Sequence, residues 1–171
     1  MTWLSEKEFH QGGAKALGVT INVAFLQEIK ADYSFRELLT DTYFRLSNPD
    51  ADGWVEPHRA AQLLGDLRDE LETYFALEEF FGYFDDAETS NPAVALAADD
   101  LRQEHTELFK QLNDLVEWAL QIAYQEVSGP EDTIGNVFAG LESFCKCLAQ
   151  HEQAEMDLMM RLCNEEIGVG D

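Results

Sequence analysis

Four residues place imidazole and carboxylate groups on helix faces that are otherwise apolar. His151 and Glu155 are four residues apart, so they lie one turn apart on the same face of an expected helix. Glu78 and His105 each interrupt another apolar stripe at helical spacing. Imidazole and carboxylate groups together suit iron, zinc or manganese. The sequence therefore predicts a metal site made by these four residues.

Burial of the carboxylates would require a compensating charge. A bare carboxylate in a protein core costs several kcal/mol, so it must be protonated, paired or bound to a metal. The chain has only 11 Lys and Arg residues, and none falls on the apolar stripes near Glu78 or Glu155. Taken singly, a stripe histidine is more often an ordinary core histidine, and a stripe glutamate can reflect a misplaced stripe. The four residues together favour a metal.

Four long helices are expected to position these residues. Apolar residues recur at helical spacing over long stretches, and strand-like alternation is absent. Asn91–Pro92 and Ser128–Gly129–Pro130 are typical helix starts. The expected pattern is an all-α, up-down-up-down four-helix bundle. Its helices would cover about 21–46, 58–84, 92–126 and 130–162, within a bundle at 21–163 that has a lead-in at 1–20 and a tail at 164–171.

The second and fourth stripes share one register. The differences 141 − 64, 151 − 74 and 155 − 78 all equal 77, and the other apolar positions keep the same offset. This offset indicates an internal duplication. It pairs Glu78 with Glu155, and Tyr74 with His151.

These residues resemble the hemerythrin-like (HHE cation-binding) domain family. In this family a histidine is followed four residues later by glutamate, whereas ferritin-like bundles use Glu-x-x-His. The resemblance covers about 21–162, nearly the whole chain. The matching stretches are LETYFALEEFFGYF (71–84), DLRQEHTELFKQL (100–112), CLAQHEQAEMDLM (147–159) and, for the first helix, EIKADYSFRELL (28–39).

The resemblance implies a bundle that holds two non-haem irons. By position, Glu78 and Glu155 would bridge the metals, and His105 and His151 would be terminal ligands. Tyr74 stands where the resemblance implies a histidine. A tyrosine can bind ferric iron as a phenolate, although a buried tyrosine more often fills volume and makes one hydrogen bond. A mononuclear and a dinuclear site both stay open, and reversible dioxygen carriage is not expected.

The first helix has no histidine at the matching position. The equivalent residue is Tyr33 or Phe35, which lie about 200° apart on a helix, so only one of them can face inward. We favour Tyr33 because Asp32–Tyr33 mirrors Glu104–His105, although Phe35 fits the apolar stripe of this helix better. Tyr33 joins Tyr74 as an additional candidate ligand.

Composition limits the classes of partner. The 171 residues include 34 acidic and 11 basic side chains, which gives a net charge of −23. That charge repels phosphate backbones and anionic lipid, so neither nucleic acid nor membrane is an expected partner. The first ten residues lack a signal-peptide pattern, and three cysteines do not make a disulfide framework. We therefore expect a cytoplasmic protein.

Three functions fit these observations. The first is a metal-binding bundle, with iron or another divalent transition metal, that serves in the sensing or storage of iron or in oxygen and redox sensing. Dioxygen or peroxide would then be a small-molecule partner. The second is a bundle without metal that acts as an interaction or scaffold domain. The third, an enzyme that uses dioxygen or peroxide, is less favoured because no substrate pocket can be read from the sequence.

Overall fold

The part of the chain that the structure describes folds into four helices and contains no strand. The computed structural model describes residues 23–48, 55–80, 92–127, 129 and 133–168. The expected lead-in at 1–20, the end of the second helix beyond residue 80 and the Asn91 cap lie outside these residues. The helices are α1 (Val23–Ser47), α2 (Pro57–Phe80), α4 (Pro92–Ala123) and α5 (Ile134–Gly168).

The helix starts follow from their capping groups. At the start of α2, the Glu56 carboxylate accepts hydrogen bonds from the backbone N–H groups of His58 at 3.0 Å and Arg59 at 2.8 Å. At the start of α5, the Thr133 hydroxyl accepts one from the Asn136 N–H at 3.2 Å. The fourth helix begins at Ile134, after Thr133, and Ser128 and Pro130 of the expected start lie outside the described residues.

The end of the last helix also differs from the expectation. The sequence predicts that the fourth helix ends near residue 162 and that a tail follows from residue 164. In the structure α5 continues to Gly168, so most of the expected tail is helical.

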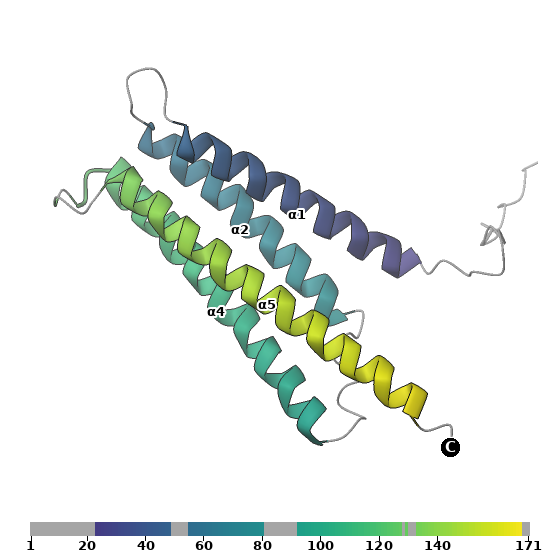
Figure 1. The fold of residues 1–171 in the computed structure, drawn as a ribbon. Helices are drawn as coiled ribbons and strands as arrows, with labels where there is room; N and C mark the ends of the chain where they lie inside the picture. Colours follow the sequence, from purple (N-terminus) through teal and green to yellow (C-terminus); the bar gives the residue numbers. More distant parts are fainter. Residues whose placement is uncertain (1–22, 49–54, 81–91, 128, 130–132, 169–171) are drawn as a thin grey trace, which may run out of the picture.

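Successive helices run in opposite directions, as expected for an up-down-up-down bundle (Figure 1). The helix α2 packs against both α1 and α4, and α4 packs against α5. The contact between α1 and α5 is much smaller. The helices therefore pack in the order α1, α2, α4, α5, and α1 and α5 close the bundle through a smaller contact.

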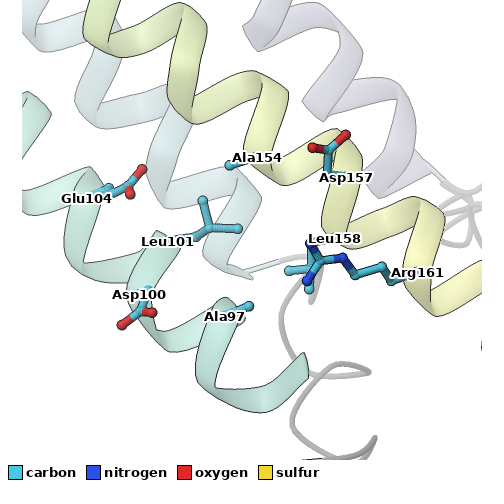
Figure 2. A pocket seen from close by; sticks show the side chains of 8 residues that line it. All are labelled: Ala97, Asp100, Leu101, Glu104, Ala154, Asp157, Leu158 and Arg161. Carbon is cyan, nitrogen blue, oxygen red and sulfur yellow. The ribbon is translucent and has the colours of Figure 1, made fainter. Parts of the chain in front are cut away.

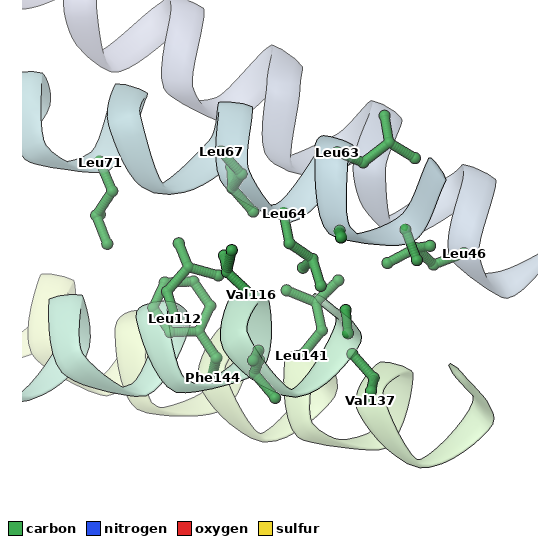
Figure 3. Packing of buried hydrophobic residues seen from close by; sticks show 14 of the residues in the cluster. Leu46, Leu63, Leu64, Leu67, Leu71, Leu112, Val116, Val137, Leu141 and Phe144 are labelled. Carbon is green, nitrogen blue, oxygen red and sulfur yellow. The ribbon is translucent and has the colours of Figure 1, made fainter. Parts of the chain in front are cut away.

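The larger hydrophobic core fills the end of the bundle near the α1–α2 connection. Its leucines and aromatic rings are less than 10% exposed, and each fully buried side chain of this size contributes about 1.5–3 kcal/mol. Figure 3 shows this packing, in which all four helices take part through Leu46, Leu63, Leu64, Leu67, Leu71, Leu112, Val116, Val137, Leu141 and Phe144.

A second, smaller apolar cluster lies toward the other end of α4 and α5. It consists of Val94, Ala98, Leu101 and Leu158. Between the two clusters, the inward positions of α4 and α5 are taken by His105, His151 and Glu155. A polar layer thus interrupts the core at the position where the sequence predicts a site.

None of the helices in the described part of the chain is long and apolar enough to span a membrane.

Candidate metal centre

Three helices bring the four predicted ligands together. Glu78 comes from α2, His105 from α4, and His151 and Glu155 from α5. The two histidines are 3% and 2% exposed, and Glu78 is 7% exposed. The Glu155 side chain is 20% exposed. Buried imidazoles and carboxylates in one layer are the arrangement that the apolar stripes predict.

The donor atoms converge on Glu155. Its Oε1 atom lies 3.2 Å from Nε2 of His151 and 3.5 Å from Nε2 of His105. The same His105 nitrogen is 3.6 Å from Oε2 of Glu78. One donor atom from each of His105, His151 and Glu155 falls within a 4.8 Å span, which is close enough for a single metal ion to bind all three.

Two further carboxylates hold the outer nitrogens of the histidines. Nδ1 of His105 is 3.0 Å from Oε1 of Glu79, and Nδ1 of His151 is 2.9 Å from Oε2 of Glu104. Because an ionised carboxylate can only accept, these contacts place a proton on each Nδ1. In the neutral imidazoles Nε2 is then the lone-pair atom, and it faces the interior. A carboxylate behind a histidine is the usual support of a metal-binding imidazole.

Aromatic rings fix the planes of the two imidazoles. The Phe75 ring stacks on His105, with centroids 4.0 Å apart and planes 9° apart. The same Phe75 ring also makes an edge contact with the His151 ring, with centroids 5.9 Å apart and planes 74° apart. The imidazoles contact each other in a T-shaped arrangement at 4.8 Å. Their rotation is therefore limited before any ligand binds.

The ionisable groups in this layer influence one another. Burial alone would lower the pKa of His151, but its contacts with Glu155 and Glu104 raise the pKa above the ordinary value. Burial alone would raise the pKa of Glu155, but its contacts with His105 and His151 lower it. Without a metal, His151 and Glu155 therefore favour the charged pair, in which a proton on the imidazole compensates the carboxylate.

Tyr74 is in the interior and is held as a phenol. It is 6% exposed, and burial followed by the negative charge of Glu78 raises its pKa far above the ordinary value. Its hydroxyl donates a hydrogen bond to Glu78. In the metal-free protein Tyr74 therefore positions Glu78, and its place as an additional candidate ligand stays a prediction.

The choice of Tyr33 on the first helix is wrong. The Tyr33 residue is 68% exposed, whereas Phe35 is fully buried and stacks on Tyr74 with centroids 5.3 Å apart and planes 5° apart. The two residues are on opposite faces of α1, and the apolar stripe decided which one turns inward. Tyr33 is therefore not a ligand of this centre.

Sequence reasoning missed Glu79 and Glu104. Each is the immediate neighbour of a predicted ligand, Glu79 after Glu78 and Glu104 before His105, so each is about 100° around the helix from the stripe. Half of each side chain is exposed, at 50% and 51%. The sequence did offer a signal, since each of these glutamates is adjacent to a candidate ligand. Attention to the apolar stripes alone leaves such neighbours out.

A groove between α4 and α5 reaches the outer side of the centre. Two pockets of about 220 and 190 Å³ lie along it, and both are lined by Glu104 and Ala154. His151 lines the smaller pocket. Figure 2 shows the larger pocket, in which Asp157 and Arg161 of α5 lie across from Glu104 of α4. Solvent therefore reaches the outer carboxylate, while the inward nitrogens stay buried.

Comparison of the chain with protein-family models, with curated proteins and with solved structures found no match.

Proposed function

We propose that this protein is a hemerythrin-like bundle that binds a transition-metal ion, expected to be iron, between α2, α4 and α5. The observation that carries the proposal is the convergence of two buried imidazole Nε2 atoms on one carboxylate oxygen of Glu155. The outer nitrogens are already held by Glu79 and Glu104, so the inward atoms are oriented for a ligand.

The donor set fits a transition metal. Two imidazoles and two carboxylates combine the ligands that iron, zinc and manganese share. A bound ion would neutralise Glu78 and Glu155, whose charges would otherwise repel each other in the interior. His105 and His151 would be terminal ligands, Glu155 would contact the ion between them, and Tyr74 would orient Glu78. Bound iron would supply redox chemistry, which supports sensing or storage of iron, or oxygen and redox sensing with dioxygen or peroxide as partner.

Metal addition should stabilise the fold. A ligand that binds only the folded state adds RT ln(1 + [L]/Kd), which is about 2.7 kcal/mol at one hundred times Kd. We expect Fe²⁺, added without oxygen to protein stripped with a chelator, to raise the melting temperature and to give saturable heat in calorimetry. Mg²⁺, which prefers oxygen ligands, is the control and should give no comparable shift.

The alternative function is a bundle without metal that acts as an interaction or scaffold domain. One observation favours it: Phe35 and Tyr74 occupy the interior positions at which the resemblance implies further histidines. A melting temperature that no transition metal changes would support this alternative and contradict the metal-binding proposal.

The outer carboxylates should set the affinity of the site. Loss of a carboxylate behind a metal-binding histidine typically costs 10–100-fold in affinity, so Glu104→Ala should weaken binding by about this factor. Glu107→Ala is the matched control, because Glu107 is an exposed glutamate on the same helix, one turn from the Glu104 level. Calorimetric titration of both variants measures the difference. Equal affinities for the two variants would exclude Glu104 from the support of the centre.

A further inference from the structure

We infer that the centre holds one metal ion, bound by Glu78, His105, His151 and Glu155, and that the described residues of the bundle leave no second ion site beside it. The inference rests on the proposed function and specifies its stoichiometry. Three features of the interior carry it: the donor spacing, the aromatic filling beside the donors and the composition of the inward face of α1.

Three of the donor–donor distances are close to the edge length of one coordination tetrahedron. With metal–ligand bonds of about 2.0–2.1 Å, adjacent donors of a tetrahedral ion are about 3.3–3.4 Å apart. Adjacent donors of an octahedral ion at the same bond lengths would be closer, about 2.8–3.0 Å. The distances around His105 and Glu155 are 3.2, 3.5 and 3.6 Å. One donor atom each from His105, His151 and Glu155 thus lies within 4.8 Å of the others, close to the separation that one ion requires, and Glu78 approaches this group through its contact with His105.

Aromatic rings fill the interior on the α1 side of these donors. Phe35 stacks on Tyr74 with centroids 5.3 Å apart, and Tyr74 in turn contacts Phe75 at 5.6 Å. These three rings are at most 6% exposed. Stacked hydrocarbon rings offer no ligand atoms, and the one polar atom among them, the Tyr74 hydroxyl, donates to Glu78.

From residue 30 onward, the described side chains on the inward face of α1 supply no imidazole or carboxylate. Among the side chains described on α1, from residue 30 onward, the buried ones are Ala31, Phe35, Thr42 and Leu46. None is an imidazole or a carboxylate. A second ion would need ligands from this helix, because the inward imidazoles and carboxylates described on α2, α4 and α5 already bind the first ion.

The nearby carboxylates between α1 and α5 already have a cation. Arg36 pairs with Asp32 at 2.6 Å and with Glu152 on α5 at 3.1 Å. These two carboxylates could serve a second ion only after the guanidinium had been displaced. A further cation on this flank would therefore compete with the Arg36 guanidinium for Asp32 and Glu152.

The test is the metal content of the full-length protein after loading with Co²⁺ and gel filtration. We expect one cobalt per chain, with the intense visible absorption of four-coordinate cobalt. Two ions per chain, or the weak absorption of six-coordinate cobalt, would overturn the inference and leave metal binding intact. No bound metal, with Fe²⁺ also failing to bind, would instead overturn the proposed function.

The Tyr74→Phe variant provides a second test, which uses the cobalt spectrum and the affinity in addition to the number of bound ions. This change removes the hydroxyl and keeps the ring that stacks between Phe35 and Phe75. If Tyr74 only positions Glu78, the variant should still bind one ion, with weaker affinity and an unchanged cobalt spectrum. A lower metal count or an altered spectrum would show that the hydroxyl is itself a ligand, against the inference.

Discussion

His151→Ala is expected to abolish metal binding and to destabilise the metal-free protein as well. The imidazole is 1% exposed and contacts Glu155 at 3.2 Å and Glu104 at 2.9 Å. Its loss removes a ligand, leaves a cavity beside Phe75 and leaves Glu155 without its closest positive partner. We expect the free energy of unfolding to fall by roughly 2–4 kcal/mol, from the cavity and the broken pair together. Chemical denaturation without metal measures this loss.

His58→Ala is the matched control for this variant. His58 is an exposed residue at the start of α2, where its ring meets only the edge of Tyr124, at 5.1 Å. We expect metal affinity to be unchanged and stability to move by less than about 0.5 kcal/mol. Metal binding by folded His151→Ala with wild-type affinity would contradict the centre described above. His105→Ala, which alters a different helix, should repeat the loss of binding.

The four candidate ligands could be identified from the sequence because they lie on the stripes that build the core. Helical periodicity specifies which residues face inward, and any ionisable residue at such a position stands out against leucine neighbours. His105 and His151 were identifiable for this reason, and so were Glu78 and Glu155. The same periodicity predicts helix existence and order, which the four-helix fold confirms.

The prediction failed on α1 because a local likeness was given more weight than periodicity. Asp32–Tyr33 is similar to Glu104–His105 in its order of acid and ring, but Phe35 lies on the stripe. Burial of a Phe ring gains about 1.5–3 kcal/mol, whereas Tyr33 can leave its hydroxyl in water at little cost. The apolar face therefore determined the rotation of this helix. At the start of α5 the cap is the Thr133 hydroxyl, which the sequence did not single out.

Glu79 and Glu104 could not be identified from a stripe because they act from its border. They reach the histidines of neighbouring helices, Glu79 from α2 to α4 and Glu104 from α4 to α5. Which helices are neighbours, and at what height, is a property of the tertiary packing. On a chain with 34 acidic residues, two carboxylates that contact histidines of neighbouring helices do not stand out.

Glu155→Gln is expected to lose the stabilisation by metal, while its effect on the metal-free protein depends on pH. Glu155 faces two imidazoles on α4 and α5, with Glu78 on α2 also near His105. The outer carboxylates Glu79 and Glu104 complete the charges around the histidines. Removal of one negative charge therefore has opposite consequences for the protonated and the neutral imidazole.

The sign follows from the direction of each pKa shift. The pKa of His151 is raised above 6.5, so its contribution to stability is complete below that pH and is lost as the pH rises through the folded value. The pKa of Glu155 is lowered below 4.5, so its contribution is present above that pH and is lost as the pH falls through the folded value. The pair thus contributes most between about pH 4.5 and 6.5.

In the metal-free protein, Glu155→Gln should therefore destabilise at about pH 5.5 by roughly 1–3 kcal/mol, less than the loss of one partner from a fully buried pair. Above the folded pKa of His151 the imidazole is neutral, and the glutamine instead relieves repulsion from Glu78. At such pH values the destabilisation by Glu155→Gln should fall to zero, or the variant should be more stable than the wild type. Denaturation curves from pH 5 to 9 measure this change.

Glu152→Gln separates this effect from a general change in helix charge. Glu152 is on the same helix, its side chain is 25% exposed against 20% for Glu155, and it pairs with Arg36, whose charge does not change in this range. Its effect should stay constant from pH 5 to 9, and metal should stabilise it as it does the wild type. A constant effect for Glu155→Gln would contradict the coupling to His151. If metal raised the melting temperature of Glu155→Gln as much as that of the wild type, Glu155 would be excluded as a ligand, because glutamine lacks the negative charge that the bound ion compensates.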